Sequence, residues 1–86
     1  MPKKTAGKKP TVIIYSTPIC TWCRKTKEFF AENRVQYTDI NVAADEKARN
    51  KMFDKSGQMG VPVIDINGTI IVGYDVGAIK KALNLK

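Results

Sequence analysis

The spacing of two cysteines constrains this chain more than any other feature of its sequence. Cys20 and Cys23 form a C-x-x-C pair, and the 86 residues contain no other cysteine and no histidine. A structural zinc site needs four cysteine or histidine ligands, and a nucleophile–histidine dyad needs a histidine, so this chain alone can build neither. A C-x-x-C pair that follows a strand and opens a helix predicts redox chemistry. Two structural thiols, or half of a metal site, are the alternatives.

The residues around the pair supply that strand and that helix. Residues 11–16 (TVIIYS) are mostly β-branched or aromatic, which indicates a buried central strand. In residues 21–33, Cys23, Thr26 and Phe30 recur at helical spacing. Residues 35–41 (VQYTDIN) alternate as a second strand with one irregularity. The three segments predict a β-α-β unit whose helix begins at the cysteines.

The second half of the chain contains four more predicted elements. They are a helix over 44–55, strands over 61–66 and 70–72, and a helix over 75–83. Asn67-Gly68 joins the two strands as a hairpin turn, because both residue types tolerate positive φ. Asp75 is the predicted N-cap of the last helix. The order β-α-β-α-β-β-α predicts an α/β fold, with a four-stranded mixed sheet flanked by three helices.

Charge is concentrated at the N-terminus. The formal net charge is +7, and four of the lysines fall in residues 1–10, together with two prolines. We interpret residues 1–10 as a disordered basic tail and residues 11–86 as one domain. The domain shows no pattern of specific nucleic-acid recognition. No apolar run approaches the ~20 residues of a membrane span, and no signal peptide is recognisable, so we expect a cytoplasmic protein without membrane contact.

The two cysteines are expected to have different roles. Cys20 lies at the predicted helix N-terminus, where unpaired N–H groups and the helix dipole favour a thiolate, and Arg24 and Lys25 add positive charge. Cys23 lies one turn further on, on the buried side, where it can resolve a mixed disulfide on Cys20. Pro62 begins an inner strand, which suggests a cis Val61–Pro62 bond facing Cys20; an ordinary strand-entry proline is the alternative.

Three segments together resemble the glutaredoxin family of the thioredoxin superfold, over about residues 11–86. They are CTWC at residues 20–23, GVP at 60–62 and VGYD at 72–75. The resemblance implies a thiol-disulfide oxidoreductase in which Cys20 is the nucleophile, Cys23 the resolving thiol and Pro62 is in cis. It also implies a glutathione groove formed by Val61, Gly73, Tyr74 and Asp75, with Trp22 as its aromatic wall. Thr17 stands where many glutaredoxins have a lysine that binds a glutathione carboxylate.

The resemblance leaves the electron donor open. Glutathione is the expected reductant, with protein disulfides or glutathione mixed disulfides as substrates and with no permanently bound cofactor or metal. A related branch of glutaredoxin-like redoxins is instead recharged by thioredoxin reductase. Some glutaredoxins carry an iron–sulfur cluster across a dimer, which is a second alternative. We otherwise expect a monomer.

Overall fold

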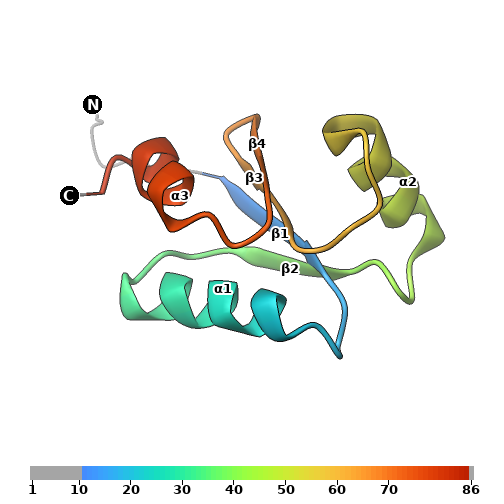
Figure 1. Ribbon diagram of the computed structural model, residues 1–86, viewed down its shortest axis with the longest axis horizontal. Coiled ribbons are helices and arrows are strands. Elements are labelled where there is room, and N and C mark those ends of the chain that lie inside the picture. The colour runs from blue at the N-terminus through green and yellow to red at the C-terminus, as the bar shows by residue number, and fades with distance from the viewer. Residues whose placement is uncertain (1–10, 86) are drawn as a thin grey trace.

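The computed structural model describes residues 11–85, which form a four-stranded sheet with three helices (Figure 1). The predicted tail, residues 1–10, lies outside the described residues. The elements in chain order are β1 (Val12–Ser16), α1 (Thr21–Glu32), β2 (Thr38–Asn41), α2 (Glu46–Ser56), β3 (Val63–Ile66), β4 (Thr69–Val72) and α3 (Val76–Leu83). This order confirms the predicted fold class.

The sheet is mixed, with strand order β2-β1-β3-β4. β1 pairs parallel with β2 and antiparallel with β3, and β4 returns antiparallel to β3. At the hairpin between β3 and β4, Asn67 and Gly68 both have positive φ, 51° and 93°, as that turn requires. The pairing of each edge strand therefore follows from a local signal: a β-α-β crossover places β2 beside β1, and a hairpin places β4 beside β3.

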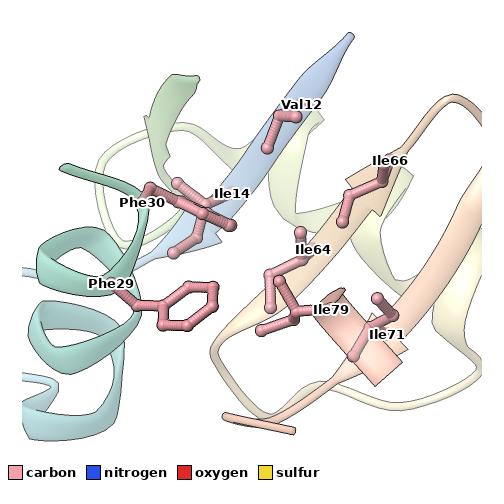
Figure 2. Packing of buried hydrophobic residues seen from close by; sticks show 8 residues of the cluster. All are labelled: Val12, Ile14, Phe29, Phe30, Ile64, Ile66, Ile71 and Ile79. Atoms are coloured by element: carbon pink, nitrogen blue, oxygen red, sulfur yellow. The ribbon is translucent and has the colours of Figure 1, made fainter. Parts of the chain in front are cut away.

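Two apolar clusters hold the helices on opposite faces of the sheet. Alternate residues of a strand point to opposite faces, so Ile14 and Tyr15 belong to different clusters. Figure 2 shows the larger cluster, in which Phe29 and Phe30 of α1 and Ile79 of α3 meet the strand residues. On the other face, Met52 of α2 packs in the cluster that contains Tyr15. α1 and α3 therefore cover one face, and α2 covers the other.

The predicted strand over 35–41 is shorter in the structure, where β2 begins at Thr38. Val35 and Tyr37 still pack against the cluster of α1, which explains their alternation. Pairing between β1 and β2 starts at Ile13, the register partner of Thr38. Asp39 follows on the face of Val35 and Tyr37, a position where alternation would place an apolar side chain. Likewise β3 begins at Val63 and not at residue 61.

Local capping signals explain where the last two helices begin. The carboxylates of Asp45 and Asp75 accept hydrogen bonds from the N–H groups of Ala48 and Ala78, at 3.0 and 3.1 Å. Each aspartate is the N-cap residue, so α2 and α3 start where the aspartates satisfy otherwise unpaired N–H groups. Neither these helices nor α1 is long and apolar enough to cross a membrane.

An ion pair links α2 to the sheet. Lys55 Nζ lies 2.6 Å from Asp65 Oδ2 and 3.1 Å from the hydroxyl of Tyr15. The hydrogen bond to Asp65, followed by the one to Tyr15, raises the pKa of Lys55 above 10.5. Burial opposes the ionisation of Asp65, but hydrogen bonds from Lys55 and from the N–H of Gly68 outweigh it and lower the pKa of Asp65 below 3.8. Both groups are therefore charged at neutral pH.

Asp65→Asn is expected to lower the free energy of unfolding by about 2 kcal/mol at neutral pH, since it leaves the partly buried Lys55 without its counter-charge. The depressed pKa of Asp65 means that its contribution is present above pH 3.8 and is lost as the pH falls further. The raised pKa of Lys55 means that its contribution is lost only as the pH rises above 10.5. Urea unfolding across these pH ranges measures both limits. Asp54→Asn, on the exposed side of α2, is the matched control, and an equal loss in both variants would contradict this account.

Candidate active site

The two cysteines lie at the start of α1 and are joined by a disulfide. Cys20 is the N-cap residue with an extended backbone, and Cys23 lies in the first turn, which brings their Cα atoms to 5.2 Å. The backbone N–H of Cys23 donates to Cys20 Sγ at 3.1 Å. Cys20 is partly exposed, whereas Cys23 is fully buried. A molecule arriving from solvent therefore meets the sulfur of Cys20 first.

The loop before β3 faces this pair. The Val61–Pro62 peptide bond is cis, and the carbonyl oxygen of Val61 lies 3.9 Å from Cys20 Sγ. This is a contact and not a hydrogen bond, because a disulfide sulfur carries no proton. The N–H of Gly73 donates to the carbonyl of Pro62 at 2.8 Å, which ties the loop to the turn after β4. Among the described residues, the N–H and C=O of Val61 pair with no other backbone group.

A cleft of about 280 Å³ lies beside the disulfide, between α1, the Val61–Pro62 loop and the turn after β4. Its walls are formed by five of the residues that the sequence singled out: Trp22, Val61, Pro62, Gly73 and Tyr74. The rings of Trp22 and Tyr74 stack with their centroids 5.9 Å apart, although Trp22 remains 56% exposed. Apolar side chains and one free stretch of backbone thus line a single cleft.

Thr17 and Asp75, also singled out from the sequence, lie outside the walls of this cleft. The carbonyl of Thr17 accepts a hydrogen bond from the N–H of Cys20 at 3.3 Å, which shapes the loop before the disulfide. Asp75 uses Oδ1 to cap α3 at the far side of Gly73 and Tyr74. Both residues thus flank the site, and each already has a structural contact.

The surface around Cys20 is apolar and basic. Ile19, directly before Cys20, is 93% exposed, and Met59, in the loop before Val61, is about half exposed. Lys25 Nζ lies 5.8 Å from the centre of the Trp22 ring, within the range of a cation–π contact. Arg24 beside it is exposed. These groups suit a partner that presents both apolar atoms and carboxylates.

Sequence reasoning missed Gln58, which shapes the loop that carries Val61. Its side-chain amide accepts from the N–H of Gly60 at 2.6 Å and donates to the carbonyl of Gly60 at 3.0 Å. The hydroxyl oxygen of Ser56 lies 2.7 Å from the carbonyl oxygen of Met52 and 2.9 Å from that of Gln58, so its one proton can be donated to either. The only signal in the sequence is a polar residue between two glycines, and that pattern does not reveal which backbone groups it bonds.

A larger hollow of about 600 Å³ lies at the opposite end of β1, lined by residues 11–12 and 35–38. The smaller cleft is the better candidate, because Val61 in its wall lies 3.9 Å from Cys20 Sγ, whereas the lining of the larger hollow includes no residue of the cysteine loop or of α1. Within residues 11–85, no three cysteine or carboxylate side chains gather as a metal site would require.

Comparison with known proteins agrees with this geometry. The family model described as Glutaredoxin matches residues 12–71. The chain belongs to the glutaredoxin family. This glutaredoxin-family chain is 50% identical over 70 residues to an uncharacterized glutaredoxin-like 8.6 kDa protein in the rubredoxin operon of Clostridium pasteurianum, which covers 81% of this chain and 93% of that protein. It is 30% identical over 66 residues to a glutaredoxin of Pseudomonas aeruginosa, covering 77% and 79% of the two chains.

Among solved structures, the glutaredoxin of Methanosarcina mazei Go1 superposes with a TM-score of 0.78 at 26% identity, covering 87% of this chain and 79% of that one. The resemblance noted in the sequence is therefore confirmed at the level of the family. This glutaredoxin-family redoxin has its Cys20–Cys23 pair at disulfide distance, which is the arrangement that thiol-disulfide exchange requires.

Proposed function

We propose that this protein reduces glutathione mixed disulfides and protein disulfides, with glutathione as the electron donor. The observation that carries the proposal is the unequal exposure of the two sulfurs at the start of α1, one partly exposed and one fully buried. The N–H of Cys23 and the helix dipole both stabilise negative charge on Cys20 Sγ. Cys20 is therefore the nucleophile, and Cys23 is the resolving thiol.

The reaction is a pair of thiol-disulfide exchanges. The Cys20 thiolate attacks one sulfur of a substrate disulfide, forms a mixed disulfide and expels the other sulfur as a thiolate. Cys23 then loses its proton and attacks Cys20 Sγ, which releases the second substrate thiol and leaves the Cys20–Cys23 disulfide. The substrate gains two electrons and two protons. Two molecules of glutathione return the pair to the dithiol and become glutathione disulfide.

The cleft beside the disulfide offers complementary groups for glutathione. The C=O of Val61 lies 3.9 Å from Cys20 Sγ, and among the described residues neither this C=O nor the N–H of Val61 has a backbone partner, so both can pair with the backbone of the glutathione cysteine. Trp22 and Tyr74 provide an apolar wall, and Gly73 leaves room between them and the loop. Asp75 keeps one carboxylate oxygen, Oδ2, to accept from the α-amino group of the γ-glutamyl residue.

Arg24 and Lys25 are the residues that bind the carboxylates of glutathione in this proposal. Thr17 is neutral and half-buried, so it can contribute a hydrogen bond but no charge at the position where many family members have a lysine. Arg24 and Lys25 are exposed beside Trp22 and carry the positive charge that a carboxylate needs. For protein substrates, Ile19 adds an apolar contact directly beside Cys20.

The choice of reductant is tested by steady-state turnover of a glutathionylated peptide. One arm supplies NADPH, glutathione reductase and glutathione, and the other supplies NADPH and thioredoxin reductase. We expect turnover in the first arm, with a KM for glutathione that Trp22→Ala raises several-fold. Phe53→Ala, which removes an exposed ring on α2 away from the cleft, is the matched control and is expected to leave that KM unchanged. Turnover in the second arm alone would contradict glutathione as the donor and remove the assignments at Val61, Gly73, Tyr74 and Asp75.

A further inference from the structure

A polar network connects the surface with the interior beneath α1. The hydroxyl of Ser16 donates to Asp39 Oδ1 at 2.5 Å, and Lys27 Nζ donates to Asp39 Oδ2 at 2.9 Å. The three residues come from β1, β2 and α1. Ser16 is only 2% exposed, whereas the side chains of Lys27 and Asp39 are 28% and 39% exposed. The Ser16 end of the network is therefore inside the protein, on the face of the sheet that α1 covers.

Ideal residue spacings in helix and strand relate this inner end of the network to the position of Cys23. α1 follows β1 through a short loop and runs back along it, so its first turn lies over the end of β1 (Figure 1). Cys23 precedes Lys27 by one turn on the same face of α1, about 6 Å along the axis. Ser16 lies two residues beyond Ile14, the register partner of Asp39, about 6.6 Å along the same face of β1. Because Lys27 reaches Asp39, Cys23 stands at the level of Ser16.

The direction of the Ser16 hydrogen bond limits what that hydroxyl can do for Cys23. Its single proton is donated to Asp39, so its oxygen can only accept a second hydrogen bond. A reduced Cys23 has an S–H to donate, and a thiolate has none. The negative charge of Asp39 also disfavours a thiolate nearby, and the positive charge of Lys27 opposes that effect.

We propose that Ser16 and Asp39 are positioning residues that hold the reduced Cys23 as a neutral thiol, with Lys27 moderating the effect of Asp39, so that Cys20 alone is the thiolate. The proposal rests on the proposed function, since it assigns the resolving role to Cys23. Cys23 then does not compete with Cys20 for incoming substrate. Cys23 loses its proton as it attacks the mixed disulfide. The opposing charges of Asp39 and Lys27 set how easily that proton is lost.

The other charged groups around α1 lie elsewhere. Arg24, Lys25 and Glu28 occupy its exposed side, and Asp75 caps α3 across the cleft. Of the hydroxyl groups on neighbouring elements, that of Thr26 donates to the carbonyl of Trp22, and Tyr74 stacks on Trp22. On β3, Asp65 faces α2 and is bonded to Lys55. Among the described residues, the Lys27–Asp39 pair is thus the charged pair between α1 and the sheet.

The ionisation state of Asp39 is consistent with this role. Burial opposes its charge, but hydrogen bonds from Ser16 and Lys27 lower the pKa of Asp39 below 3.8. Asp39 therefore stays a carboxylate across neutral pH and orients Ser16 throughout the range in which thiols titrate.

The test is an NMR titration of the reduced protein, labelled with ¹³C at cysteine Cβ, in which each thiol is followed separately. At a fixed pH below the titration midpoint, Asp39→Asn is expected to raise the thiolate fraction of Cys23 about two- to fivefold, and Lys27→Gln to lower it by a similar factor, as partly exposed charges would. Ser16→Ala is expected to raise it. The double variant Lys27→Gln with Asp39→Asn is expected to return close to the starting value. Glu28→Gln, on the exposed side of α1, is the matched control.

Shifts of the same sign for Asp39→Asn and Lys27→Gln would overturn the proposal, because a merely structural disturbance would act equally through either partner. No shift in both variants would overturn it as well. Thermal unfolding of each variant verifies that it is folded before titration. The titration needs neither substrate nor reductant, so failure of the proposed function would appear in the turnover assay and not in this experiment.

Discussion

Cys20→Ser is expected to abolish disulfide reduction, lowering turnover of a glutathionylated peptide by about a thousandfold or more. The reason is chemical: a serine hydroxyl at this position stays protonated at neutral pH and cannot displace a thiolate from a disulfide. The fold is expected to persist, since Cys20 is a partly exposed N-cap residue and serine is a favoured N-cap. Turnover is measured under the glutathione arm described above. Activity retained in Cys20→Ser would remove Cys20 as the nucleophile.

Cys23→Ser is the matched control, because it removes the other sulfur of the same disulfide. Cys20 can still attack, but no thiol remains within the chain to resolve the product. The variant is expected to accumulate a mixed disulfide with a protein substrate, visible by mass spectrometry as an adduct that a reducing agent removes. Absence of the adduct, with Cys20 intact, would contradict the resolving role of Cys23.

Phe30→Ala is expected to give the largest loss of stability, about 3–5 kcal/mol in the free energy of unfolding. Phe30 is fully buried where α1 packs on the sheet (Figure 2). Its ring centre lies 5.4 Å from that of Tyr37 and 6.3 Å from that of Phe29. Alanine would leave a cavity between α1 and β1 that rigid neighbours cannot fill. Urea unfolding of the oxidised protein measures the loss.

Phe53→Ala provides the comparison for that measurement, because it deletes the same ring from a site that is 46% exposed on α2. The expected loss is about 1 kcal/mol or less, since much of the ring is already in water. Equal losses in the two variants would mean that the packing of α1 on the sheet does not dominate the stability of this fold.

The order of the elements could be predicted because each depends on neighbours within a few residues. The Asp75 cap, the Asn67-Gly68 turn and the alternation in residues 11–16 are local signals, and the structure contains the helix, hairpin and strand that they indicate. The start of β2 could not be predicted from alternation. Alternation reports which side chains face the core, whereas strand assignment needs a partner strand, and β1 provides one only from Thr38 onward.

The candidate site also has one part that the sequence predicted and one part that depends on tertiary packing. The C-x-x-C spacing and its place at a helix start identify the reactive pair and its order of exposure, because helix geometry fixes which cysteine lies one turn deeper. The sequence could nominate Trp22 and Tyr74 separately through a family resemblance. Their stacking across one cleft depends on how α1 packs beside the turn after β4, and no local pattern carries that information.

The sequence by itself determined the fold class, the redox-active pair and the positions of the turns and caps, since these follow from backbone preferences and short-range hydrogen bonds. Only the tertiary structure decided that Ser16, Asp39 and Lys27 form one network and that Gln58 holds the loop beside Cys20. The physical reason is that a polar side chain bonds to groups that tertiary packing brings within hydrogen-bond distance. Strand register and helix placement decide which groups those are, and both are set only when the core assembles.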